Sequence, residues 1–212
     1  MQAPSPFFVL SNAGCFMSLM APRDFSITHP VPSQVNCPSF LTAYLYRKLT
    51  ACLAGDEAFK EQARSTYEGF MTKIHEARPH GDGDWFMWSS LHLAADSFVT
   101  RALGNVPYAT VERWEANHAH TWQTILLTYY CTDAGRKFFD EVIDLSGSNA
   151  LAYTCTDKAF GIGFSYDNTN IFKPETWTGE NQYGKALQSF RDTLIKNPGA
   201  YATDPKYKDP FN

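Results

Sequence analysis

The sequence predicts a mainly α-helical protein, a single helical domain with a few short strands. Several long segments repeat apolar residues at the i, i+3, i+4 spacing of one helix face. Strand-like segments are short, and they occur only before residue 39 and between residues 149 and 181. These strand-like segments leave an α+β fold as the alternative.

The predicted elements follow from local signals in order along the chain. "PFFVLSNAGCF" (6–16) and "DFSITHPV" (24–31) are the strand-like pieces of the N-terminal region. Serine, aspartate and glycine at suitable positions then mark where helices begin and end. The predicted helices are 40–55 with Ser39 as its N-cap, 57–77 after Asp56, 85–103 ended by Gly104, a segment helical at least from 116, 136–147 and 181–197.

Length and composition favour one hydrophobic core. The chain has 212 residues, of which 44% are hydrophobic and 15% aromatic, and this is enough for a domain over residues 1–197 followed by a polar tail over 198–212. The net charge of −4 and the pI near 5.8 argue against broad electrostatic binding to a nucleic-acid backbone. They still allow a local basic pocket for one phosphorylated ligand.

The cysteines and the apolar segments predict a soluble, cytoplasmic protein. The five cysteines are widely spaced and form no CxxC pair, so reduced thiols are expected rather than disulfides or a zinc site. The first residues lack the basic start of a signal peptide. No segment has the roughly 18 apolar residues needed to span a membrane, and the histidines and acidic residues form no recognisable metal-ligand pattern.

Lys48 is unusual because it lies in the middle of an apolar helix face. A lysine at the edge of such a face can bury its methylene groups and keep its ammonium group in water. In the centre of the face, the charge is costly unless it is paired, and a desolvated amine is a good nucleophile toward a carbonyl. Both interpretations stay open. The apolar residues around Lys48 are Leu41, Tyr44, Leu45, Leu49 and Cys52.

Two features near the C-terminus suggest ligand contact, each with a structural alternative. Gly161 and Gly163 in "AFGIGF" indicate either close approach of the backbone to a ligand or a tight turn. The helix start at Asn181, with Lys185 nearby, could bind an anion or could be an ordinary capped helix.

The segment 151–194 resembles the NADAR family. "LAYTCTDKAFGIGF…WTGENQYGKALQSFRDTL" follows the family motifs L-V-E-x-S/T, D-x-x-W-G-x-G and G-x-N-x-L-G-x-x-L-M-x-x-R-x-x-L. In these motifs Phe160 replaces a Trp, Tyr153 a Glu and Gln188 a Met. The matching positions are Leu151, Asp157, Gly161, Gly163, Gly179, Asn181, Gly184, Leu187, Arg191 and Leu194.

Two earlier segments extend the resemblance. The family pattern P-T-S-E-H-Y-F-Q-A-Q-K-F aligns without gaps over "PSFLTAYLYRKL" and places the family lysine on Lys48. "LSN" is similar to the family's F-S-N. Residues 56–148 do not align well, so the family tryptophan of that region is either Trp114 or Trp122.

The resemblance implies an N-glycosidase that removes ADP-ribose from guanine bases in nucleic acid or a nucleotide, with no metal or redox cofactor. A lysine of the family can hold the opened ribose as a Schiff base, which assigns Lys48 as the nucleophile or as the group that polarises the ribose carbon C1″. The remaining assignments are Asp157 to orient or protonate, Phe160, Tyr44 and Trp122 to stack on a base, Arg47, Lys185 and Asn181 to bind phosphate, Ser11 and Asn12 to bind ribose, and Gly161 and Gly163 to line the site.

One departure from the family concerns the catalytic acid. The family carries a glutamate, proposed as an acid/base, where this sequence has Leu41. Cleavage of an N-glycosidic bond needs an acid for the departing base, so Asp157 is the first candidate substitute and Glu180 the second. The alternatives are an N-glycosidase for a ribosyl intermediate of riboflavin synthesis, a non-catalytic ADP-ribose-binding module, and a helical structural or interaction protein.

Overall fold

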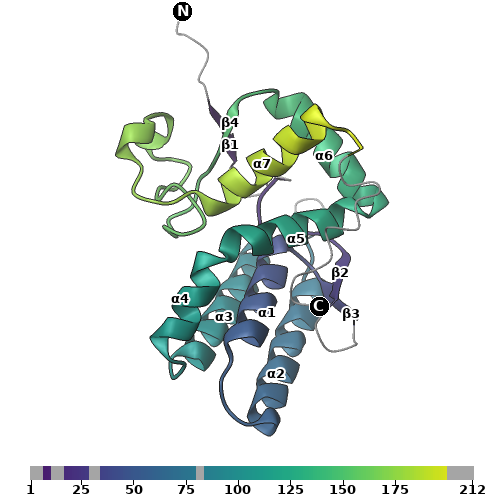
Figure 1. The fold of residues 1–212 in the computed structure, drawn as a ribbon, viewed down its shortest axis with the longest axis vertical. Coiled ribbons are helices and arrows are strands. Elements are labelled where there is room, and N and C mark those ends of the chain that lie inside the picture. The colour runs from purple at the N-terminus through teal and green to yellow at the C-terminus, as the bar shows by residue number, and fades with distance from the viewer. Residues whose placement is uncertain (1–6, 11–16, 29–33, 80–83, 200–212) are drawn as a thin grey trace, which may run out of the picture. The chain divides into compact units, whose positions relative to one another are not determined.

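A computed structural model describes residues 7–10, 17–28, 34–79 and 84–199 (Figure 1). The chain divides into two compact units, one formed by residues 22–121 and the other by residues 1–21 and 122–212. We call the first the Lys48 unit and the second the β4 unit, and we describe each by itself. The predicted ribose contacts Ser11 and Asn12, and residues 200–212 of the predicted tail, lie outside the described ranges.

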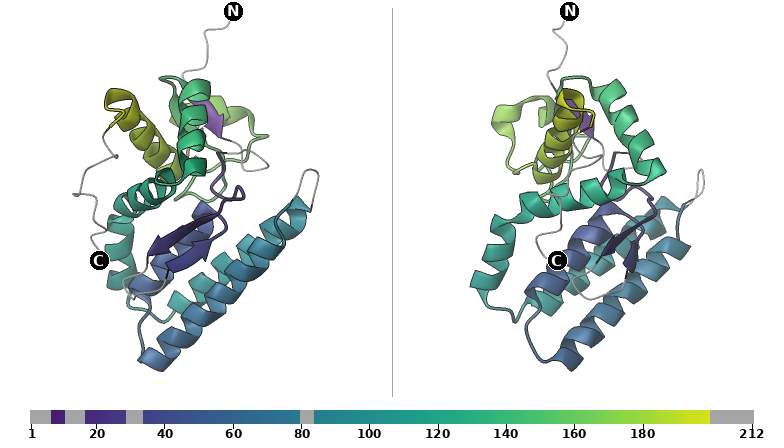
Figure 2. Two further views of the ribbon diagram at one scale, coloured as in Figure 1. Left: turned by 90° about the vertical axis from the view of Figure 1, so that its right-hand side faces the viewer. Right: turned by 45° about the vertical axis from the view of Figure 1, so that its right-hand side comes forward.

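The Lys48 unit combines a short two-stranded antiparallel sheet with helices that pack on one another. Within it, α1 packs against α2, α3 and α4, and α2 runs beside α3 (Figure 2). Strand β3 lies against α1, and its register pairs Phe25 with Cys37. The elements are β2 (Phe25–Thr28), β3 (Gln34–Cys37), α1 (Phe40–Cys52), α2 (Glu57–Glu76), α3 (Trp85–Leu103) and α4 (Tyr108–Ala116).

Helices α1 and α2 begin at the caps that the sequence predicts. The Ser39 hydroxyl accepts from the Thr42 amide, and the Thr42 side chain accepts in turn from the Ser39 amide, which makes a complete capping box for α1. The Asp56 carboxylate caps α2 by accepting from the Phe59 amide at 2.8 Å. After α1, Gly55 adopts a φ of +126°, a conformation that favours glycine.

Two elements of the Lys48 unit differ from the sequence prediction. Strand β3 lies outside the two strand-like pieces that the sequence predicts in the N-terminal region. Helix α4 begins at Tyr108 and ends at Ala116, whereas the sequence predicts helix with a firm start only at residue 116, within a segment that is helical at least from there. Trp114 is the one buried residue of α4, so this helix has no apolar stripe that could reveal it.

The β4 unit is built around a parallel pair of short strands. Strand β1 pairs with β4 so that Phe7 lies opposite Ala150 and Leu10 opposite Tyr153. Helix α7 packs on β4 and also on α6. The elements are β1 (Phe7–Leu10), α5 (His118–Tyr130), which begins four residues before this unit, α6 (Asp133–Ser146), β4 (Ala150–Tyr153), two short 3-10 helices (Thr169–Phe172 and Pro174–Thr176) and α7 (Gln182–Lys196).

Side-chain amides from α7 and the residue before it complete the hydrogen bonding of β4. The Asn181 side chain accepts from the Tyr153 amide at 3.0 Å and donates to the Leu151 carbonyl at 2.8 Å. One turn along, the Gln188 side chain accepts from the Leu151 amide at 3.1 Å. In the described part of the chain, strand β4 is paired with β1 on one side only, so backbone groups on its other side have no strand partner. These three side-chain bonds satisfy those groups.

The predicted fold class, mainly α with a few short strands, is confirmed. The single domain over 1–197 stays a prediction. None of the helices in the described part of the chain is long and apolar enough to cross a membrane.

A buried histidine supports the start of the helix that carries Lys48. His92 is 0% exposed, and its Nε2 lies 2.9 Å from the Ser39 hydroxyl. Its Nδ1 lies 2.8 Å from the Trp88 carbonyl, which can only accept, so Nδ1 carries the proton and Nε2 accepts from Ser39. Burial lowers the pKa of His92 from 6.5 to about 4.

We expect this histidine to make stability depend on pH. Because the pKa of His92 is lower in the folded state, the unfolded chain binds the extra proton between pH 6.5 and 4. Acidification across that window should therefore remove about 3 kcal/mol of unfolding free energy, with no further loss from this group below pH 4. Urea titrations of the wild type and His92→Gln from pH 7 to pH 4 measure the difference. Equal pH profiles for the two proteins would contradict the assignment.

Candidate functional site

Lys48 reaches from the apolar face of α1 to a carboxylate on α4. Its side chain is 24% exposed, and Nζ lies 3.4 Å from Oε1 of Glu115, whose side chain is 53% exposed. The predicted apolar face is buried as expected, since its five apolar members are each 8% exposed or less. The lysine is thus paired at a partly open position and surrounded by buried neighbours.

Three more side chains form the surroundings of this ion pair. Tyr44, one turn before Lys48, packs edge-on against Trp114 with the ring centroids 6.0 Å apart. Cys52, one turn after Lys48, is buried, and burial raises the pKa of its thiol to about 11, although the Lys48 charge acts in the opposite direction. We call Lys48, Glu115, Tyr44, Trp114 and Cys52 the Lys48–Glu115 cluster.

This cluster combines a primary amine and a carboxylate next to aromatic side chains. A lysine amine can attack an electrophilic carbon once its proton has been removed. A carboxylate 3.4 Å away is close to hydrogen-bond range for accepting that proton and transferring it to a leaving group. Since both groups are partly exposed, a substrate can approach them without unfolding of α1 or α4.

Arg47, a predicted phosphate contact, is part of the interior. It is 8% exposed and lies close enough to Cys37 of β3 for its charge to counteract the effect of burial on that thiol. Burial still dominates and raises the pKa of Cys37 to about 12. The role of Arg47 in phosphate binding stays a prediction.

The glycines of the C-terminal motif allow backbone segments of the β4 unit to pack against each other. A Cβ atom on Gly161 would lie 2.8 Å from the backbone of Cys155, and one on Gly179 would lie 2.6 Å from the Gly163 nitrogen. Gly163 has a φ of +85°. These glycines thus allow a tight turn and close contact between backbone segments, and their predicted role in lining a ligand site stays a prediction.

The backbone amides at the start of α7 are already hydrogen-bonded. The amides of Asn181, Gln182 and Tyr183 donate to the carbonyls of residues 161, 159 and 160, at 2.9, 3.1 and 3.2 Å. An anion at this helix end would have to displace those carbonyls. Lys185 is exposed near this helix start, and its role in phosphate binding stays a prediction.

The two carboxylates predicted as substitutes for the family glutamate are both in the β4 unit. Asp157 accepts from the amides of Ala159 and Phe160, at 2.8 and 3.0 Å, and so stabilises the turn before the glycines. Glu180 accepts from the Gln182 side chain at 2.7 Å. Both carboxylates have local structural partners.

Of the two candidate tryptophans, Trp122 is in the core of the β4 unit. It is 0% exposed and packs against Phe160 and Tyr183, with ring centroids 5.9 and 5.2 Å apart. Stacking of a ligand on Trp122 would require that core to open. Trp114, in contrast, is one of the walls of the Lys48–Glu115 cluster.

The predicted site residues are therefore divided between the two units. Lys48, Tyr44 and Arg47 belong to the Lys48 unit, while the β4 unit contains Asp157, Trp122, Phe160, Gly161, Gly163, Asn181 and Lys185. Sequence reasoning missed Glu115, which is 67 positions away from Lys48 in the chain. Its position next to Trp114, a candidate family tryptophan, was the one available signal. Among the described residues, no group of three or more His, Cys, Asp or Glu could hold a metal ion.

Comparison of the chain with family models, with curated proteins and with solved structures finds no match.

Proposed function

We propose that the protein is an N-glycosidase that releases ADP-ribose from guanine in nucleic acid or a nucleotide, with Lys48 as the nucleophile. The resemblance to the NADAR family suggests the substrate class and the lysine. The observation that carries the proposal is the Lys48–Glu115 pair, with 3.4 Å between Nζ and Oε1. Glu115 supplies a carboxylate to this site, although Leu41 stands where the family has its glutamate.

The reaction begins with transfer of a proton from the Lys48 ammonium group to Glu115. The neutral amine attacks the ribose carbon C1″, and the bond from C1″ to the base nitrogen breaks. Glu115 returns the proton to that nitrogen, so the base leaves as a neutral molecule. Ring opening then moves a proton from the lysine nitrogen to the ring oxygen and leaves an imine. Water hydrolyses the imine, releases ADP-ribose and restores the Lys48 ammonium group.

Release of free ADP-ribose from an ADP-ribosylated guanine oligonucleotide tests this function. Chromatography of the reaction should show ADP-ribose and the unmodified oligonucleotide appearing together. No release, combined with micromolar binding of ADP-ribose by calorimetry, would replace the enzyme with a binding module. Neither release nor binding would refute both ligand-based functions. Release only from a ribosylated pyrimidine would favour the riboflavin-pathway alternative.

We expect Glu115→Gln to lower kcat by about 10² to 10⁴, the usual contribution of a general acid or base. KM should change little, because the amide keeps the size of the side chain. The loss should be smaller for substrates whose leaving base is already a good leaving group. Steady-state kinetics with Glu57→Gln as the control measures this, since Glu57 is paired with Lys60 at 2.9 Å on α2. Equal losses in the two variants would assign the effect to charge alone.

The proposal retains the intracellular location that the cysteine pattern predicts.

A further inference from the structure

A cavity between β3 and α2 lies in the Lys48 unit and has a volume of about 310 Å³. This is at the lower end of the range of about 300 to 1,000 Å³ typical of small-molecule pockets. It includes no residue of the Lys48–Glu115 cluster, so its ligand is independent of the proposed reaction. Its lining comprises Gln34, Val35, Asn36, Pro38, Glu68, Met71, Thr72 and His75.

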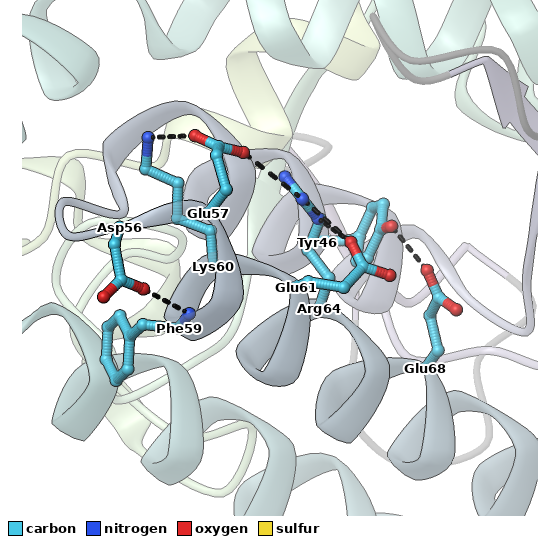
Figure 3. Close-up of polar contacts among 8 residues, drawn as sticks. All are labelled: Tyr46, Asp56, Glu57, Phe59, Lys60, Glu61, Arg64 and Glu68. Carbon is cyan, nitrogen blue, oxygen red and sulfur yellow. Dashed lines mark hydrogen bonds and ion pairs between the residues drawn. The ribbon is translucent and has the colours of Figure 1, made fainter.

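Glu68 presents a fixed carboxylate to this cavity. The buried Tyr46 hydroxyl, on α1, donates to Oε1 of Glu68 at 2.7 Å (Figure 3). This bond uses one carboxylate oxygen and holds the other in a defined direction. Burial, together with this hydrogen bond, raises the pKa of Tyr46, so the hydroxyl keeps its proton and remains a donor.

The charge of Glu68 is not neutralised by its helix neighbours. Arg64, one turn earlier, is directed to Glu61 at 2.9 Å and to Glu57 at 4.0 Å (Figure 3). No ion pair to Glu68 occurs within the described part of the chain. His75, which also lines the cavity, lies 3.3 Å from Asp24, and Asp24 is also paired with Arg78 at 2.6 Å. Glu68 is therefore the one carboxylate among the residues that line the cavity.

The remaining lining offers neutral acceptors and apolar contact. The Thr72 hydroxyl donates to the Glu68 carbonyl at 3.1 Å, which leaves its oxygen as an acceptor for a ligand. Gln34 and Asn36 add amide groups, and Val35, Pro38 and Met71 add apolar surface. An ammonium group has three donors, so it needs further acceptors beside the one carboxylate. Its alkyl chain needs apolar surface next to them.

We propose that this cavity binds a primary alkylammonium ion, with the ammonium group on Glu68 and Thr72 and the aliphatic chain on Val35, Pro38 and Met71. Free alkylamines and the lysine side chain share this chemistry. The two sources are separated by comparing n-butylamine with an unstructured lysine-containing peptide.

Nuclear magnetic resonance titration of the full chain with n-butylamine tests this site, with n-butanol as the uncharged probe of the same size. The amine should shift the amide signals of β3 and of α2 around Glu68 in a saturable manner. The alcohol should bind about tenfold more weakly, a difference of about 1.4 kcal/mol, because it has no positive charge to pair with the Glu68 carboxylate. Equal affinity for the two probes, or no shift at these signals, would overturn the proposal.

A matched pair of variants on one helix completes the test. Glu68→Gln can still accept from Tyr46, so it should fold normally and bind the amine no better than the alcohol. Glu61→Gln, whose carboxylate pairs with Arg64 and does not line the cavity, should retain the preference for the amine. Equal loss in both variants would indicate nonspecific attraction to an acidic helix and would overturn the site.

Discussion

Replacement of Lys48 with arginine is expected to lower the release of ADP-ribose about a thousandfold or more, because guanidinium is not a nucleophile at neutral pH. Arginine keeps the positive charge and can still pair with Glu115, so substrate binding should change much less than kcat. The stability of the fold should also change little, because a partly exposed ion pair of this kind contributes about 1 kcal/mol or less.

Lys60→Arg is the matched control for this substitution. Lys60 also pairs with a glutamate, Glu57, and its side chain is 30% exposed, close to the 24% of Lys48. The control should retain full activity. If Lys48→Arg retains activity as well, or if it lowers only the affinity for the substrate, the cluster binds the ligand but does not provide the nucleophile.

Replacement of Asn181 with glycine is expected to destabilise the protein by about 2 to 4 kcal/mol, because it removes two hydrogen bonds to buried backbone groups of β4. Glycine accepts the observed φ of 53° without strain, so this variant isolates the loss of the side-chain bonds. Asn181→Ala should cost about 1 kcal/mol more, because its Cβ disfavours a positive φ.

Asn197→Gly is the control at the opposite end of α7. Asn197 is exposed, and its side chain accepts from the Gly199 amide at 3.3 Å. Its replacement should change the unfolding free energy by about 0.5 kcal/mol or less. Chemical denaturation of the three variants beside the wild type provides the comparison. A change for Asn181→Gly as small as that for Asn197→Gly would show that β4 does not depend on the amide.

Local signals in the sequence were sufficient to predict most of the helices. Ser39 and Asp56 act on amides three residues away, so the sequence around each helix start contains the whole interaction. The same holds for the buried face around Lys48, which depends only on helical spacing.

The missing information concerns residues that are distant in the chain. Glu115 meets Lys48 only because α4 packs against α1, and no local pattern encodes that contact. The helix start at Asn181 was compatible with an anion site or an ordinary cap, and neither indicated that its side-chain amide bonds to β4, 28 and 30 positions earlier. Fixed spacing identified the glycines of "AFGIGF" without indicating which backbone segments pack against them.

Borohydride trapping tests the central claim, that Lys48 forms the covalent intermediate, most directly. The protein is incubated with the ADP-ribosylated guanine oligonucleotide, reduced during turnover, digested and analysed by mass spectrometry. The proposed mechanism predicts an ADP-ribosyl adduct on Lys48 that is absent from Lys48→Arg and unchanged in Lys60→Arg. An adduct that persists in Lys48→Arg, or rapid turnover with no adduct on Lys48, would contradict it.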